Sequence, residues 1–348
     1  MVVSDIFNSE KQNLFTKLCG DISSTLNALD GSLSSNDKSN SSISRFNAAN
    51  AGEKVEIDLT AYDVLTLAKS VYELTEGYYN PAVYYNVLAY GFNEATDIAK
   101  PPEQRIPSDA VIAKYNALSQ SFNQIQLSKE GDKYYAVKPD ITVEADGVTY
   151  SMKIDLGGIG KGYAVDEINR IIDSYGFKYG YLSFGTSSIL VKEHYVNGSY
   201  SLGFTNPRAD AQSNIYVSTS VKSECLSTSG DYEQFFIYDS DNDGVKERYC
   251  HVFDPTTGRP VQTGIMSATV IGGSAAEDDA LTTAIMAMGK EKAVEFINEK
   301  LSARKVVFCY DNNGEYEIIT NIPESEIKIM HDKFEIVNTV SDGKIVLG

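Results

Sequence analysis

The sequence predicts a protein of the α/β or α+β class, with an N-terminal helical part followed by a mixed sheet core. Apolar residues recur at helical spacing over residues 10–29 and 59–75. From about residue 125 onward, short runs typical of strands alternate with helical patterns, and no internal repeat is found. Helices first and alternating elements afterwards are the order expected of these mixed classes.

Composition narrows the class of function. The 348 residues are enough for one large domain or two smaller ones, and the hydrophobic content of 42% is typical of a globular protein. The formal net charge of −18 excludes nucleic acid as a partner, because its phosphates require a basic surface. A phosphorylated ligand would therefore need local positive charge from a metal ion, a few lysines or a helix N-terminus.

Neither the spacing of the cysteines nor the N-terminal sequence indicates a metal site or a targeting segment. The cysteines show no metal-ligand spacing, and we expect buried free thiols at Cys19, Cys225, Cys250 and Cys309. No apolar run is long enough for a membrane helix. The N-terminus lacks the apolar core of a signal peptide, so we expect either a cytoplasmic protein or the trimmed mature form of an exported one.

The N-terminal elements are predicted as follows. Residues 2–7 form a short strand and residues 10–29 the first amphipathic helix. Residues 31–47 are rich in Ser and Asn, which favours either a flexible linker or a folded, ligand-facing loop. A second helix covers 59–75. The following loop, 78–85, bears tyrosines that serve either a planar ligand or packing under the loop.

The later elements follow from alternating patterns and turn residues. A proline-bearing connection over 101–107 leads into a helix over 108–119. A further helix over 274–289 is capped by Ser274 and closed by Gly289. Strands are predicted at 125–127, 133–137, 149–154, 179–191, 200–205, 215–221 and 232–237.

The glycine-rich stretch over residues 155–166 is the first with chemical potential. It has four glycines within six residues, with Lys161 among them, and a helical pattern follows. Glycines let backbone amides approach a ligand closely, and a helix N-terminus adds positive dipole. Neither the Walker nor the Rossmann spacing is present. The stretch is either a phosphate-binding turn or an ordinary strand-to-helix turn.

The helix over 274–289 offers oxygen ligands. Asp279 and Thr283 are four residues apart and share one face, with Thr282 beside them. A carboxylate and a hydroxyl so placed suit Mg²⁺, which retains waters and takes phosphate oxygens. The ordinary alternative is an acidic first turn that complements the helix dipole, with a threonine bonded back to the backbone. Spacing alone favours that alternative.

His251 is one of only three histidines and precedes Asp254 by three residues at a predicted strand end. A histidine with a carboxylate nearby is typical of general acid–base chemistry, and a structural histidine is the alternative.

An acidic run copies the first half of an EF-hand loop and offers Asp239, Asp241 and Asp243 as Ca²⁺ ligands. Cys250 stands at the twelfth position, where a bidentate Glu belongs. A solvated acidic hairpin turn is therefore favoured over a partial calcium site.

Taken together, these stretches resemble the ApbE-type flavin transferases. Seven stretches follow the order of that family and span roughly residues 1 to 310: 33–36, 44–47, 75–81, 155–162, 227–232, 251–258 and 279–284. The resemblance implies a single α/β domain, the T-fold, that covers 1–320 and binds FAD in a cleft. Residues 321–348 would then form a C-terminal extension of unassigned role.

The resemblance also implies an activity. With Mg²⁺, enzymes of this family cleave FAD, release AMP and attach FMN through a phosphoester bond to a threonine of a partner protein. Their partners are typically membrane-associated redox subunits, and the family is usually exported, so an extracytoplasmic, membrane-associated location is expected. FAD hydrolysis to FMN and AMP by a pyrophosphatase is the alternative. A non-catalytic flavin-binding protein would not require His251, Asp279 and Thr283 together.

Residue roles carry over by position. The implied metal contacts are Asp279, Thr283, the adjacent Thr282 and the backbone carbonyl of Gly158. The implied FAD contacts are Asn36, Tyr78, Tyr79, Asn80, Asp155, Lys161 and the backbone near Phe253. His251 takes the place of the probable catalytic histidine, and Asp155 is a second candidate base.

The chain departs from the family pattern at three places. Asn80 stands where an aspartate is common, and residues 184–187 replace a double glycine. Asn36 replaces an aromatic residue found in many members, which leaves open the balance between transfer and hydrolysis. No flavin-acceptor sequence is found, so the chain resembles the enzyme and not its substrate.

Overall fold

The computed structural model describes residues 1–3, 9–92, 99–145, 147–185, 187–209 and 213–347. The chain divides into two compact units. Unit 1 comprises residues 1–27, 161–230 and 263–348, and unit 2 comprises 28–160 and 231–262. Both units mix helices and strands, which confirms the predicted fold class. The expected division into a domain over 1–320 and an extension over 321–348 stays a prediction.

Unit 1 is built on an eight-stranded sheet, whose neighbours are antiparallel except for the last pair. In spatial order its strands are β1 (Val2–Val3), β7 (Gly180–Phe184), β8 (Ser188–Val191), β11 (Cys225–Gly230), β16 (Ile265–Ile271), β17 (Lys305–Asn312), β18 (Glu315–Thr320) and β20 (Phe334–Ile336). Every residue of β16 is buried, as expected of a central strand covered on both faces.

One face of this sheet packs against a second, three-stranded sheet. Its strands, in spatial order, are β19 (Ile327–Ile329), β10 (Ile215–Val221) and β9 (Tyr200–Thr205). Leu226 of β11 belongs to the core cluster on this face and Cys225 to the cluster on the other, as strand alternation requires. β19 and β20 lie in these sheets, so residues beyond 320 contribute to the core. A hairpin of β21 (Asn338–Ser341) and β22 (Lys344–Leu347) ends the described chain.

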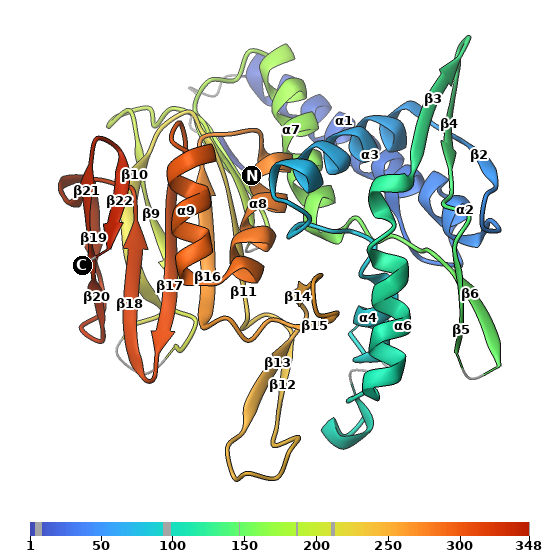
Figure 1. The fold of residues 1–348 in the computed structure, drawn as a ribbon. Helices are drawn as coiled ribbons and strands as arrows, with labels where there is room; N and C mark the ends of the chain where they lie inside the picture. The colour runs from blue at the N-terminus through green and yellow to red at the C-terminus, as the bar shows by residue number, and fades with distance from the viewer. Residues whose placement is uncertain (4–8, 93–98, 146, 186, 210–212, 348) are drawn as a thin grey trace. The chain divides into compact units, whose positions relative to one another are not determined.

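Helices cover the opposite face (Figure 1). They are the unit 1 part of α1 (Ser9–Leu33), α7 (Gly157–Ser174, of which residues 161–174 belong to unit 1), α8 (Ala275–Met288) and α9 (Lys290–Lys300). Val165 and Ile168 of α7 pack with Leu18 of α1. The helix predicted over 274–289 is confirmed with both caps, since the Ser274 hydroxyl accepts the Glu277 amide and Gly289 follows the last turn.

The described residues of unit 2 form helices, a small sheet and three hairpins. The helices are α2 (Ser42–Ala48), α3 (Leu59–Leu74), α4 (Tyr84–Ala89) and α6 (Asp109–Ser119), with 3₁₀ turns η1 (Pro102–Gln104) and η2 (Phe122–Gln124). The sheet has the order β2 (Lys54–Ile57), β4 (Lys133–Val137) and β3 (Gln126–Glu130). The hairpins pair β5 (Thr142–Ala145) with β6 (Val148–Ser151), β12 (Phe235–Tyr238) with β13 (Glu247–Cys250), and β14 (Phe253–Asp254) with β15 (Arg259–Pro260).

Several local predictions need correction. A flexible linker over 31–47 is wrong, because α1 continues to Leu33 and α2 begins at Ser42. The Ser41 hydroxyl caps α2 by accepting the Ser44 amide at 2.9 Å, and the helix buries Ile43 and Phe46. The predicted aromatic loop over 78–85 ends early, because α4 begins at Tyr84. The predicted strand over 2–7 is seen at Val2–Val3, and residues 4–8 lie outside the described residues.

The strand predictions also missed several elements, including β2 of unit 2 and β16, β17 and β18 of the unit 1 sheet. The β5–β6 hairpin takes part of the region expected as one strand over 149–154, and β11 was not predicted at all. β11 is rich in small polar residues, whose strand preference comes only from its neighbours in the sheet.

No disulfide joins the cysteines. Buried thiols are confirmed for Cys225, Cys250 and Cys309, whereas Cys19 is exposed on α1 and that prediction is wrong. None of the described helices combines the length and the apolar character needed to cross a bilayer.

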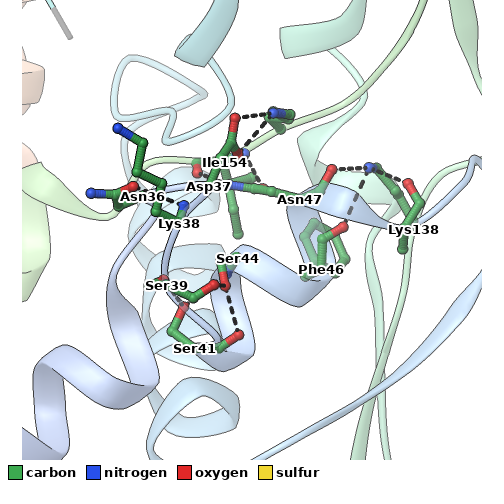
Figure 2. A network of polar contacts seen from close by, with 12 residues as sticks. Asn36, Asp37, Lys38, Ser39, Ser41, Ser44, Phe46, Asn47, Lys138 and Ile154 are labelled. Carbon is green, nitrogen blue, oxygen red and sulfur yellow. Dashed lines mark hydrogen bonds and ion pairs between the residues drawn. The ribbon is translucent and has the colours of Figure 1, made fainter. Parts of the chain in front are cut away.

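A polar network in unit 2 fixes the chain just before α7 (Figure 2). The Asn47 side chain donates from Nδ2 to the Ile154 carbonyl and accepts the Ile154 amide at Oδ1, both at 2.9 Å. An amide side chain paired in this way imitates a neighbouring strand and leaves little freedom to residue 154. The 44–47 stretch therefore positions the start of the glycine-rich segment.

Lys138 supports the same network at the C-terminal end of α2 (Figure 2). Its side chain is buried, and Nζ donates to the carbonyls of Phe46, Asn47 and Ala49 at 3.3, 3.0 and 2.8 Å. These carbonyls lie at the C-terminal end of α2, and a cation suits that end of a helix. Burial, and then repulsion from Lys153, lower the pKa of Lys138 to about 8.

We predict opposite effects for two glycines of α7. A Cβ at Gly162 would lie 2.1 Å from the Ala275 carbonyl oxygen and 2.7 Å from the Ala276 Cα, so Gly162→Ala forces backbone apart. Gly162→Ala should lower the free energy of unfolding by about 1–3 kcal/mol, as overpacking does. Gly160→Ala is the control, because no atom lies within 4 Å of its Cβ, and it should leave stability unchanged or raised. Equal effects in denaturant unfolding would contradict this packing.

Lys138 should make stability depend on alkaline pH. Its pKa is about 8 in the folded chain against 10.5 for the ordinary side chain, so between these values the unfolded chain holds the extra proton. Stability should therefore rise with pH across this window, by at most about 1.4 kcal/mol per unit. Lys138→Met lacks this titration. Unfolding free energies of both proteins at several pH values test it, and parallel pH profiles would contradict it.

Candidate active site

The glycine-rich segment and the acidic face of α8 meet within unit 1. Asp279 is only 2% exposed, and its Oδ2 accepts the Gly162 amide at 3.1 Å. Burial raises the pKa of the Asp279 carboxyl, while the positive charge of Lys161 and the Gly162 amide oppose that rise. A carboxylate in such surroundings favours a cation beside it.

The two threonines differ in their surroundings. The buried Thr282 hydroxyl donates to the Asp279 carbonyl at 2.8 Å and lies 2.8 Å from Ser229 Oγ. Thr283 is partly exposed, and its hydroxyl lies 3.4 Å from both the Asp279 carbonyl and Ser229 Oγ. The threonine-to-backbone hydrogen bond expected as the alternative to metal binding is thus present. Of the two hydroxyls, Thr283 is the more accessible to a ligand.

Ser229 was missed by the sequence reasoning as a site residue. It lies on β11, in a stretch whose pairing with β16 places its side chain beside the threonines of α8. A serine in a small polar strand has no spacing signal of its own. Only the 227–232 stretch of the family resemblance pointed to this region.

These donors fit Mg²⁺. The Asp279 carboxylate and the Thr283 hydroxyl are hard oxygen donors that would hold the ion, with Thr282 beside them. Lys161 adds the positive charge that phosphate oxygens need in an acidic protein. Gly158 belongs to unit 2, and the role of its carbonyl stays a prediction.

Asp155 lies in unit 2 immediately before α7. Its amide donates to the Pro81 carbonyl at 2.8 Å, and its Oδ1 accepts the Gly157 amide at 2.8 Å. The first contact ties the 75–81 stretch to the glycine-rich segment, and the second caps the helix. Asp155 therefore has a defined structural role. Its contacts with FAD stay a prediction.

The 78–80 segment separates into buried and partly exposed residues. Tyr79 and Asn80 are buried. Asn80 Nδ2 donates to the Ser119 carbonyl at 3.0 Å, and Oδ1 accepts the Ala82 amide at 2.9 Å. Packing is thus the stronger interpretation for Tyr79 and Asn80, while the partly exposed Tyr78 is the better candidate for stacking on a ring.

Asn36 lies in an exposed turn between α1 and α2. Its Oδ1 accepts the Lys38 amide at 2.9 Å, a local turn contact (Figure 2). Nearby, Lys153 pairs with Asp37 at 3.0 Å. Exposure leaves this turn open to a ligand, and its predicted contact with FAD stays a prediction.

His251 directly follows β13, at the predicted strand end. Its Nδ1 lies 3.3 Å from the Gln234 carbonyl, which can only accept a hydrogen bond. We therefore assign the proton to Nδ1, which makes Nε2 the basic nitrogen. Phe253, two residues on, is buried in an aromatic cluster with Tyr90 and Phe92, so its side chain is a packing residue.

The acidic run forms the turn between β12 and β13, which confirms the predicted hairpin. Asp239, Asp241 and Asp243 each offer a carboxylate oxygen, and these oxygens lie within 4.8 Å of one another. Asp239 and Asp243 also accept the Gly244 and Val245 amides at 3.0 and 2.7 Å. These contacts stabilise the turn without a metal, and calcium binding here stays a prediction.

Known proteins match this chain over most of its length. The ApbE family profile matches residues 6–308. The FAD:protein FMN transferase of Escherichia coli is 27% identical over 277 residues, covering 78% of this chain and 71% of that protein. The FAD:protein FMN transferase of Treponema pallidum is 27% identical over 270 residues, covering 75% and 69%.

Solved structures agree on the fold. The flavin transferase ApbE from Vibrio cholerae superposes with a TM-score of 0.69 at 23% identity, covering 91% of this chain and 90% of that one. The ApbE protein from Thermotoga maritima gives a TM-score of 0.70 at 25% identity, covering 88% and 89%. The chain belongs to the ApbE family and is an enzyme of the transferase class.

Proposed function

We propose that the chain is a magnesium-dependent FAD:protein FMN transferase. It cleaves FAD, releases AMP and attaches FMN by a phosphoester bond to a threonine of a partner redox protein. The observation that carries the proposal is the approach of Asp279 to Lys161 and the Gly162 amide, with the Thr283 hydroxyl 3.4 Å from the Asp279 carbonyl, an arrangement suited to a metal-bound pyrophosphate. The names of the curated relatives support the same activity.

The proposed chemistry is phosphoryl transfer. Asp279 and Thr283 would hold Mg²⁺, which when bound neutralises charge on the pyrophosphate. Lys161 adds a second positive charge, and the Gly162 amide keeps Asp279 oriented. Catalysis of this kind depends mainly on positioning and electrostatic stabilisation, which are what these residues provide.

The proton of the attacking hydroxyl needs an acceptor. We assign it to Nε2 of His251, because the Gln234 carbonyl fixes the proton on Nδ1. Asp155 is the second candidate. The threonine oxygen forms a bond to the FMN phosphorus, the bond between the two phosphates breaks, AMP leaves, and the proton passes to the base.

FAD hydrolysis is the competing function, since water can replace threonine without any change in these residues. Asn36, which replaces an aromatic residue of many members, leaves that balance to experiment. A membrane redox subunit as partner and an extracytoplasmic, cell-envelope location also belong to the proposal and rest on the family resemblance. Calcium binding at Asp239, Asp241 and Asp243 is proposed separately, from the closeness of their carboxylates, and transfer does not require it.

Incubation with FAD, Mg²⁺ and an acceptor protein, followed by intact mass measurement, tests the activity. The proposal predicts a mass gain of one FMN on the acceptor and an equal amount of AMP. AMP and free FMN without an adduct would support the hydrolase instead. No FAD turnover in the presence of Mg²⁺ would contradict both functions.

Variants of α8 test the metal face. Asp279→Ala should lower Mg²⁺-dependent turnover on the order of 100-fold, because it removes the charged ligand. Thr283→Val should lower turnover, and Thr283→Ser, which keeps the hydroxyl, should retain most of it. Initial rates across a Mg²⁺ titration measure both effects. Full activity of Asp279→Ala would rule out Asp279 as a metal ligand. Equal activity of Thr283→Val and Thr283→Ser would rule out the Thr283 hydroxyl as a ligand.

A further inference from the structure

Asp166 ends the glycine-rich stretch, and none of the roles assigned so far uses it. It lies on α7 one turn beyond Gly162, so the two residues share a face of that helix. Its Oδ1 accepts the Ala275 amide at 2.8 Å, and its Oδ2 accepts the Ala276 amide at 2.9 Å. Both carboxylate oxygens are thus engaged on successive amides at the start of α8.

These two amides have no partner within their own helix. The first amides of any helix lack internal acceptors and need a cap. The side chain of Ser274, the N-cap of α8, accepts the Glu277 amide at 3.2 Å and its carbonyl accepts the Asp278 amide at 3.0 Å. A side chain from another helix therefore completes the capping of α8, although burial disfavours its charge and raises the pKa of the Asp166 carboxyl.

The contacts between α7 and α8 come in two pairs. Asp166 binds the amide of Ala275, and Gly162 donates its amide to Asp279. Positions 162 and 166, like 275 and 279, are four residues apart, so each pair lies along one helix face. Two attachments one turn apart fix both the rotation and the sliding of α8 relative to α7.

The close approach at Gly162 allows the two helices little freedom to shift. A Cβ there would lie 2.1 Å from the Ala275 oxygen, so main chain meets main chain at this point. Such a contact has no side chain that can adjust if the helices shift. The orientation of Asp279 then depends on the other attachment, at Asp166.

We propose that Asp166 is a positioning residue of the metal site. By capping α8 from α7, its carboxylate sets Asp279 beside Lys161 and the Gly162 amide and thereby orients the α8 face that carries Thr283. The proposal rests on the proposed function in one respect, the metal that this face would bind. Residues that orient metal ligands without touching the ion typically change metal affinity by about 10- to 100-fold.

The test uses the full chain and Mn²⁺ as the probe, followed by electron paramagnetic resonance in the presence of FAD. Asp166→Asn keeps one acceptor oxygen and Asp166→Ala keeps none. The apparent Mn²⁺ dissociation constant should rise in the order wild type, Asn, Ala, by about 10- to 100-fold at the end of the series. The KM for FAD at saturating metal should change much less.

Ser274→Ala is the matched control, because it removes the other cap of α8 without touching α7. It should lower the thermal midpoint without weakening Mn²⁺ binding. Equal loss of Mn²⁺ affinity in Ser274→Ala and Asp166→Asn, or unchanged affinity in Asp166→Asn, would overturn the proposal.

Hydrogen exchange of residues 157–166, read by mass spectrometry, separates this inference from the proposed function. Exchange should be faster in Asp166→Asn than in Ser274→Ala, because Asp166 bonds α7 to α8 whereas the Ser274 side chain caps α8 locally. If wild type binds no Mn²⁺, the metal site and the proposed function fail, and exchange then decides the helix contact alone. Equal exchange in the two variants would contradict that contact.

Discussion

The main chains of α7 and α8 touch at Gly162, and the metal face depends on that contact. The absence of a Cβ lets the Ala275 carbonyl approach, and the Gly162 amide then reaches the buried Asp279 carboxylate. Burial of a carboxylate is unfavourable unless positive charge or hydrogen bonds compensate it. Lys161, next to this glycine, supplies such charge. The same lysine would serve a phosphate ligand in a protein of net charge −18.

In unit 2, polar side chains hold the residues that precede α7. Asn47 holds Ile154, and the Pro81 carbonyl accepts the Asp155 amide, so two stretches of the family pattern support the residues before α7. Lys138 in turn stabilises the end of α2, which carries Asn47. Several residues of unit 2 that match the family pattern therefore support the segment before α7. His251 is among the residues of this unit that remain candidates for catalysis.

What the sequence predicts well here is local. The helix over 274–289 follows from its apolar spacing and its two caps, and the shared face of Asp279 and Thr283 follows from helix geometry. β11, Ser229 and the cap supplied by Asp166 could not be predicted, because each is defined by a partner far away in the chain. The family resemblance predicted the order of the stretches. It did not predict that Asn80 is buried as a packing residue while Tyr78 is partly exposed.

Anomalous diffraction from crystals grown with FAD and Mn²⁺ tests the central claim most directly. Our account predicts the strongest manganese peak in direct contact with a carboxylate oxygen of Asp279, with the Thr283 hydroxyl as a second ligand. Such a peak would place the metal on the face that α7 and α8 form together. A manganese peak only at the 239–243 turn, or none beside α8, would contradict the account.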